Sequence, residues 1–190
     1  MKKIIALLLV VAVICVAVSC GKDQQDGTNA STEASTVATT AATTAYVSPT
    51  DGVDTKDYTA RTLCELFLSL VEAYPDEDLE QIAARYMSDK WFVNREMDIY
   101  SEAYPDGYMP YIVGLKDEFI VPRYASVTHI LPFMFPNTYV SHAFVLEEGT
   151  DADAFCKALA DNADLAFNVC MISSDCYADH VGNIAFFVIK

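Results

Sequence analysis

Apolar residues in the first part of the folded chain recur at helical spacing. Across residues 58–74 they are separated by steps of three and four, which places them on one face of a helix. Pro75 disfavours helical geometry in the residue before it, so this helix is expected to end there. A second short helix follows, with acidic residues 76–78 in its first turn. The apolar spacing also predicts a third helix within residues 91–104.

The middle of the chain is rich in residues that break helices. Five prolines and two glycines lie between Tyr104 and Asn137, which argues against regular helix across that stretch. Short strands are expected near residues 125–131 and across residues 138–147, where Gly149 ends the second one.

A helix and a hairpin are expected after these strands. Thr150 and Asp153 have the spacing of a capping box, so a helix is expected to start there and to run towards Met171. Strands 176–181 and 184–189 flank Gly182-Asn183, a two-residue turn typical of a β-hairpin. The last strand is apolar on both faces, which predicts a strand that is central in the sheet or covered on both sides.

These elements predict an α+β fold. Amphipathic helices come first, followed by a β-α-β-rich C-terminal half with a small mixed or antiparallel sheet. Residues 51–190 are long enough for one globular domain with a single core.

The N-terminal segment has the layout of an export signal. Lys2 and Lys3 precede an apolar run of 15 residues, 4–18, and small residues then lead to Cys20. This run is short for a membrane span, which needs about 20 apolar residues. We therefore expect a signal peptide at residues 1–19, and an uncleaved anchor is the alternative.

A flexible tether is expected between the signal and the domain. Thr, Ser and Ala dominate residues 21–50, and large apolar side chains are few. Such a segment cannot bury enough surface to offset the entropy of ordering. We therefore assign residues 20–50 to a cysteine followed by a disordered tether.

Residues 17–20, Ala-Val-Ser-Cys, resemble the end of a bacterial lipoprotein signal. In that family the cysteine receives a diacylglycerol group and becomes the new N-terminus. Leu is the usual residue at the position of Ala17, so the match departs from the pattern there. The resemblance implies that Cys20 is lipidated and that the protein lies on the extracytoplasmic face of the cell membrane. Two or three acyl chains give a stable anchor, because each buried CH₂ contributes about 0.8 kcal/mol.

Charge and composition limit the classes of partner that the protein is expected to bind. The chain carries 12 Lys and Arg against 27 Asp and Glu, a net charge of −15, and 53% of its residues are apolar. It is too apolar for a disordered acidic protein, and an acidic surface repels phosphate backbones. No nucleic-acid partner is therefore expected. The expected partners are the membrane, through the lipid anchor, and a protein or other component of the cell envelope.

Four cysteines remain after the signal is removed and Cys20 is lipidated: Cys64, Cys156, Cys170 and Cys176. The exported compartment permits disulfides, and Cys170 and Cys176 could close a small loop. Cys64 and Cys156 flank the apolar faces of expected helices, which is typical of buried free thiols.

An envelope enzyme or metal-binding protein that uses cysteine and histidine is the first alternative. Cys170, Cys176 and His180 do not have a compact zinc spacing. They would also need a fourth ligand from another histidine. Cys176 and His180 are about 13 Å apart along one strand, too far for a thiol–imidazole pair. His129 and His142 could approach each other if their strands pair, although strand histidines satisfied by hydrogen bonds are favoured.

An aromatic-lined module that binds carbohydrate or peptide is the second alternative. It would need two of Tyr104, Tyr108 and Tyr111 exposed in a groove. The many aromatics of residues 86–139 are better explained as core beneath the Pro-rich segment. The acidic clusters lack a calcium loop, and no nucleotide, nucleophile-elbow or zinc-protease motif is present. No cofactor and no metal are therefore expected.

The C-terminal part of the chain carries a wider resemblance. Segments 141–146, 150–155 and 182–189, preceded by the lipoprotein signal and tether, resemble a family of small uncharacterised lipoproteins of Gram-positive bacteria, a domain of unknown function. The likeness covers about the last 60 residues. It implies an exported α+β domain and transfers no site residues. The resulting expectation is a lipid-anchored, non-catalytic binding module at the cell envelope.

Overall fold

The computed structural model describes residues 45–107, 109–134, 137–168 and 170–190. The expected signal peptide, Cys20 and most of the expected tether lie outside these residues. Among the described residues, no helix combines the length and the apolar character that a membrane span requires.

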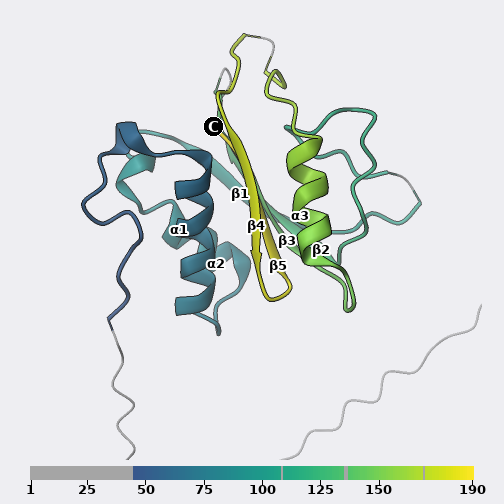
Figure 1. Cartoon of the computed structure of the whole chain (residues 1–190), viewed down its shortest axis with the longest axis horizontal. Coiled ribbons are helices and arrows are strands. Elements are labelled where there is room, and N and C mark those ends of the chain that lie inside the picture. Colours follow the sequence, from purple (N-terminus) through teal and green to yellow (C-terminus); the bar gives the residue numbers. More distant parts are fainter. Residues whose placement is uncertain (1–44, 108, 135–136, 169) are drawn as a thin grey trace, which may run out of the picture. The chain divides into compact units, whose positions relative to one another are not determined.

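A five-stranded antiparallel sheet forms the centre of the fold, in the order β1-β2-β3-β5-β4 (Figure 1). Its strands are β1 (Met97–Ala103), β2 (Ser126–Pro132), β3 (Val140–Val145), β4 (Cys176–Val181) and β5 (Ile184–Ile189). The described part of the chain also forms helices α1 (Ala60–Ala73), α2 (Leu79–Tyr86) and α3 (Ala152–Asp161) and short 3₁₀ turns η1 (Thr55–Asp57) and η2 (Lys90–Phe92). The expected α+β fold is confirmed, and the sheet is antiparallel throughout.

The helices cover both faces of the sheet. Helices α1 and α2 lie on one face and α3 on the other (Figure 1). The irregular segment between β1 and β2 also covers the α3 face, through buried residues such as Leu115 and Tyr124. Strand β5 is almost completely buried, because both of its faces are covered and both of its edges are paired. This confirms the cover on both sides expected for residues 184–189, whereas the middle strand of the sheet is β3.

Helices α1 and α2 begin at capping boxes. Thr59 accepts a hydrogen bond from the Thr62 amide, and the Thr62 side chain accepts one from the Thr59 amide. Asp78 and Gln81 form the same reciprocal pair at the start of α2. These bonds satisfy amides that the first helical turn leaves without partners. Helix α1 ends before Pro75, as expected.

The third helix expected within residues 91–104 is wrong. Lys90–Phe92 forms η2, and Met97–Ala103 forms the edge strand β1. Met97 and Ile99 pack against the core under α1 and α2. Every residue of β1 has a partner on the buried strand β2, and this long-range pairing outweighs the local helical spacing.

Helix α3 starts one residue later than expected and ends earlier. Asp151, rather than Thr150, caps the helix by accepting from the Ala154 amide. The helix ends at Asp161, before the expected extension to Met171. The chain pairs there with the loop before β2, because Asp164 donates its amide hydrogen to the Gly114 carbonyl and Lys116 donates to the Asn162 carbonyl.

The folded unit begins before the expected boundary at Asp51. The Tyr46 hydroxyl hydrogen-bonds Ser69 on α1 at 2.8 Å. Thr50 is buried and donates to Asp89 at 2.8 Å. Residues 45–50 therefore belong to the same compact unit as the remaining described chain.

An aromatic cluster fixes α1 and α2 on the sheet. Phe67 of α1 stacks on Phe186 of β5, with ring centroids 4.0 Å apart and planes 6° apart. Tyr86 of α2 meets both rings edge-on. Phe92 and Tyr139 extend the cluster towards β3. Such pairs add to the free energy of burial and restrict how the helices can lie.

Replacing Phe67 by Ala should reduce the free energy of unfolding by about 3–5 kcal/mol, because the ring is fully buried and its loss leaves a cavity. Urea unfolding followed by circular dichroism measures this change. Phe133→Ala is the matched control, since Phe133 is exposed; it should change the free energy of unfolding by less than about 0.5 kcal/mol. Equal losses in the two variants would contradict the assignment of this core.

Candidate functional site

A groove of about 810 Å³ lies between α1, α2 and one end of the sheet. Its walls are the end of α1, the start of α2 and the residues between them. Its floor is formed by residues of all five strands and by Asn183 in the turn between β4 and β5. A groove of this volume is within the usual range for binding a small molecule or a peptide segment.

Small side chains explain why a space remains between the sheet and the helices there. At the other end of the same face, Ile130 and Phe186 fill the space beneath α1 and α2. At the groove end the neighbouring positions hold Ser101, Ser126 and Thr128. The Ser101 and Thr128 hydroxyls hydrogen-bond each other at 2.8 Å across β1 and β2. These side chains are too small to fill the groove, and the hydrogen bond between them gives each of the two hydroxyl groups a partner.

The rim of the groove is acidic. Glu72, Glu77, Asp78 and Glu80 line it, and none of the described residues that line the groove is Lys, Arg or His. Glu77 is paired, because Arg85 donates two hydrogen bonds to its carboxylate at 2.6 and 2.5 Å and lowers the pKa of Glu77. Asp78 caps α2. Glu72 and Glu80 are exposed at the rim.

Apolar side chains make up the rest of the groove. Val71 and Leu79 contribute from the helices, and Val145, Val181 and Ile184 contribute from the sheet. No Cys or His lies among the described lining residues, so the groove has no thiol or imidazole for nucleophilic or general base chemistry. Its chemistry fits a ligand that has both apolar and positively charged parts.

His129 and His142 meet on the opposite face of the sheet. They are direct partners in the β2–β3 register, and their Nδ1 atoms are 2.9 Å apart. His142 donates from Nε2 to the Val113 carbonyl at 2.8 Å. Its Nδ1 therefore accepts the hydrogen bond from Nδ1 of His129. The expected approach of the two imidazoles is confirmed.

The environment of this pair lowers the pKa of both rings. Burial, together with the smaller effect of the charge of a protonated His129, lowers the pKa of His142 to about 3. Burial also lowers the pKa of His129, although the Glu102 carboxylate, 3.2 Å from its Nε2, opposes that shift. Tyr100 stacks on the His129 ring. The pair therefore joins β2, β3 and the loop at Val113, and it has no open position for a ligand.

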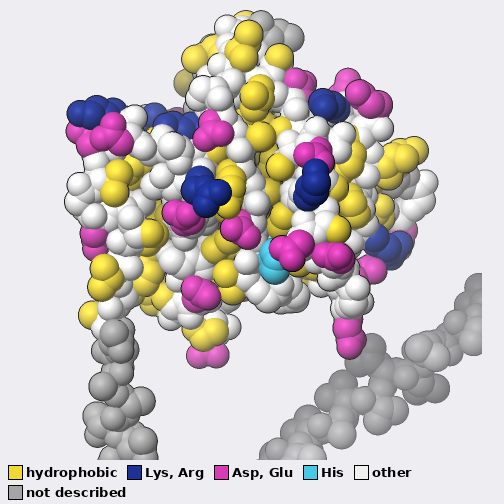
Figure 2. All heavy atoms as spheres, viewed as in Figure 1, with side chains coloured by type: hydrophobic (Ala, Val, Ile, Leu, Met, Phe, Trp, Pro, Cys, Tyr) yellow, Lys and Arg dark blue, Asp and Glu magenta, His cyan; other side chains and the backbone are white. Residues whose placement is uncertain are grey.

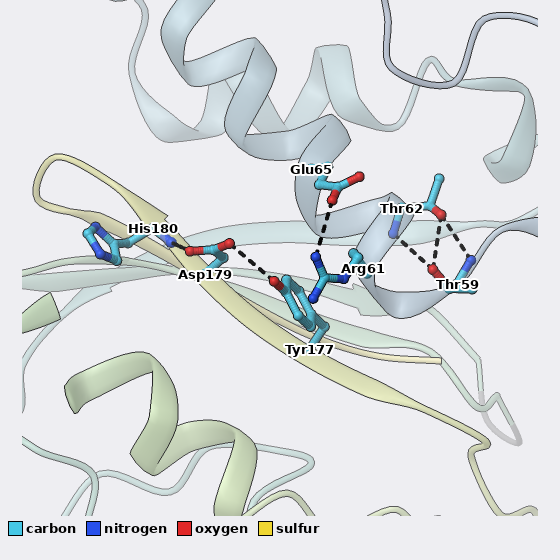
Figure 3. Close-up of polar contacts among 7 residues, drawn as sticks. All are labelled: Thr59, Arg61, Thr62, Glu65, Tyr177, Asp179 and His180. Atoms are coloured by element: carbon cyan, nitrogen blue, oxygen red, sulfur yellow. Dashed lines mark hydrogen bonds and ion pairs between the residues drawn. The ribbon is translucent and has the colours of Figure 1, made fainter. Parts of the chain in front are cut away.

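Strand β4 presents a second polar cluster along its free edge (Figure 3). The Tyr177 hydroxyl donates to Asp179 at 3.3 Å, and the His180 amide donates to the same carboxylate at 2.9 Å. The Arg61 guanidinium lies over the Tyr177 ring at 4.5 Å and is 3.8 Å from Glu65. The Asp179 carboxylate thus accepts a hydrogen bond from an amide of β4 and places a charge beside the free edge of that strand. Both features hinder pairing of this edge with another chain.

The Cys and His residues considered for metal or thiol chemistry are not brought together. His180 contacts Asp153 at 3.2 Å, and Cys176 lies near the Ala160 carbonyl. Within the described ranges, no group of three or more His, Cys, Asp or Glu residues could hold a metal ion.

The four cysteines of the domain are free thiols in the structure. Cys64 and Cys156 are buried, as expected. Burial raises the pKa of Cys64 and raises that of Cys156 to about 12, which leaves both thiols unreactive. Cys170 is exposed and Cys176 half-buried, and the disulfide between them stays a prediction.

The tyrosines considered for carbohydrate binding do not line the groove. Tyr104 is half-buried and packs edge-on against Tyr124, whereas Tyr111 is exposed. Tyr108 lies outside the described residues. Much of the remaining aromatic set, such as Trp91 and Tyr139, is buried in the core.

The groove was not among the candidate sites found in the sequence. Asp76, Glu77 and Asp78 are expected in the acidic first turn of a helix, but α2 begins only at Leu79: Asp78 is its cap, and the acidic residue of its first turn is Glu80. The signal that could have pointed to the groove is the row of small hydroxyl residues in β2, Ser126 and Thr128, on a face that is otherwise apolar. Such a row gains meaning only once the facing helices are known.

Acidification should destabilise the protein through the histidine pair. In the unfolded chain histidine has a pKa of about 6.5, so the unfolded state binds protons that the buried rings exclude. The stabilising contribution is therefore complete above about pH 6.5 and is lost as the pH falls towards the lowered native values. For His142 the loss is about 2 kcal/mol between pH 7 and pH 5.

Urea unfolding at several pH values measures this dependence. His142→Phe should unfold more easily at pH 7 but lose less stability on acidification than the unchanged protein. His180→Gln is the control, because His180 lies outside the pair, and it should keep the full acid-dependent loss. An unchanged pH slope in His142→Phe would contradict the assignment.

Comparisons of the chain with protein-family models, curated proteins and solved structures gave no match.

Proposed function

We propose that the protein is a lipid-anchored binding module on the extracytoplasmic face of the cell membrane, and that its groove binds an apolar, positively charged segment of an envelope protein. The observation that carries the proposal is the groove itself, which combines apolar side chains, a floor of small hydroxyl residues and four carboxylates at the rim. Membership of the lipoprotein family of unknown function is part of the same proposal.

Binding accounts for the groove better than catalysis does. The hydroxyls of Ser101 and Thr128 bond each other, and no imidazole or thiol among the lining residues could activate them. The buried histidine pair lies on the other face of the sheet and is held by Val113. A groove with these groups can hold and orient a ligand, but its described lining offers no imidazole or thiol for catalysis.

Charge favours a cationic ligand. The chain has a net charge of −15, and the groove concentrates that charge around apolar surface. Acidic side chains also dominate the lower part of the surface that Figure 2 shows. A long-range negative field of this kind attracts positively charged segments and repels anionic ones. The apolar side chains of the groove then provide the area that a bound side chain can bury.

The groove should prefer a basic amphipathic peptide to an acidic one. The probes are two synthetic peptides of about ten residues, one alternating Leu and Lys and the other alternating Leu and Glu, measured by fluorescence anisotropy. Replacing both Glu72 and Glu80 by Gln should weaken binding of the Leu-Lys peptide about fivefold to tenfold, because two rim charges are lost. Binding should also weaken as salt increases.

Two further variants make this test specific. Glu118→Gln with Glu148→Gln removes the same charge from exposed positions outside the groove and should change affinity less than twofold. Ser101→Phe fills the floor from the edge strand and should abolish binding while the far-ultraviolet spectrum is kept. Equal affinity for the two peptides, or equal effects of the two charge-removing pairs, would refute the proposed site.

The anchor depends on Cys20. In cells given a labelled fatty acid, the unchanged protein should carry the label and sediment with membranes. Cys20→Ser should lose the label and appear in the soluble fraction, because the acyl chains supply the membrane affinity. Cys170→Ser, at an exposed thiol, is the control and should keep the label. A mature protein that retains Met1 and carries no acyl mass would overturn the anchor.

A further inference from the structure

Two loops project together from one end of the sheet. One joins β2 to β3, and the other leads from α3 to β4 (Figure 1). The Asn168 side chain donates to the Asn137 carbonyl at 3.1 Å, and the Ser173 hydroxyl donates to the Thr138 carbonyl at 2.7 Å. These bonds hold the bases of the two loops side by side.

Both loops expose large apolar side chains. Phe133 and Met134 are 63% and 70% exposed, and Met171 and Ile172 are 43% and 78% exposed. We call these four side chains the apolar tip. Large apolar groups gathered on adjacent projecting loops form the kind of exposed patch that is often an interaction site.

The apolar tip carries no charge in a strongly acidic protein. Residues 131–146 and 165–174 contain no Asp, Glu, Lys or Arg, although the chain has a net charge of −15. The projection at the top of Figure 2 accordingly shows hydrophobic and uncharged atoms. Charged residues begin at its base, where the Glu96 carbonyl accepts the Phe133 amide hydrogen.

We propose that the apolar tip inserts into the outer surface of the lipid bilayer that carries the anchor. Four side chains at these exposures offer about 450 Å², taking about 180 Å² for a fully exposed large side chain. A stable protein interface needs about 800 Å² on each partner and a polar rim that pairs with it. A bilayer requires neither, because it accepts a few projecting apolar groups without complementary polar partners.

The chain is long enough to bring the apolar tip to the membrane. This step rests on the proposed anchor at Cys20. From Cys20 to Tyr46 there are 26 residues, which span up to about 88 Å when extended. A domain of this size is about 38 Å across. The first described residues and the apolar tip lie at opposite ends of the domain in Figure 1, and the intervening chain can cover that distance.

Vesicle quenching tests the insertion without the anchor. The protein used is the compact unit 45–190, which has its own core. The probe is a vesicle of zwitterionic phosphatidylcholine with brominated acyl chains, which quench only tryptophan that reaches them. Phe133→Trp should lose at least half of its added emission. Glu148→Trp lies at an exposed position beyond the other end of β3 and should keep its emission. The buried native Trp91 should also be unaffected.

A matched pair of charged variants measures the contribution of the apolar tip. Met134→Asp should weaken vesicle binding at least tenfold, because an ionised carboxylate must enter the apolar boundary. Val47→Asp introduces the same charge at an equally exposed apolar position outside the apolar tip, and it should weaken binding less than twofold. Binding should not fall with added salt, since the apolar tip has no charge.

Three outcomes would overturn the inference. They are absence of quenching in Phe133→Trp, equal effects of the two Asp variants, or concentration-dependent dimers that Met134→Asp dissociates, which would make a second copy the occupant. These results do not depend on acylation. If Cys20 proves to be unmodified while Phe133→Trp is quenched, the anchor fails and the insertion stands.

Discussion

The stacking of Phe67 on Phe186 is the contact on which the arrangement of this domain depends. Phe186 lies in β5, the strand with a partner on each side and cover on both faces. Phe67 lies in the middle of α1. Their contact sets the distance and direction of α1 over the sheet, and Tyr86 then positions α2 against the same two rings. Because protein interiors are closely packed, these bulky groups leave little freedom in how the helices lie.

The groove follows from the same constraint. Large aromatic rings hold α1 and α2 on one part of the sheet, and the groove lies where the same helices meet its other end. There the sheet offers Ser101, Ser126 and Thr128, which are too small to fill the space. The start of α2 brings its acidic first turn to the opening, where a negative charge is favoured by the helix dipole. One packing arrangement therefore produces both the open floor and the acidic rim.

The proposed interactions divide the surface of the domain by charge. The groove has carboxylates around its apolar side chains, whereas the apolar tip has no charged residue. The groove lies where the strands meet the turn between α1 and α2, and the apolar tip lies where β2 turns into β3. A domain whose apolar tip contacts a bilayer would thus keep its acidic groove available to a ligand in solution.

Local signals in the sequence determined much of the fold. Pro75 ended α1, and Gly182-Asn183 placed the β4–β5 hairpin at its expected residues, because such effects act within a few bonds of the residue concerned. The apolar character of residues 184–189 also indicated a strand that is covered on both faces. The tertiary structure decided the rest. Strand β1 has helical spacing in the sequence, yet its backbone finds partners on β2 that only the fold supplies. The groove likewise combines two helices and five strands that are distant in sequence, so its volume and charge arise from packing that no local pattern encodes.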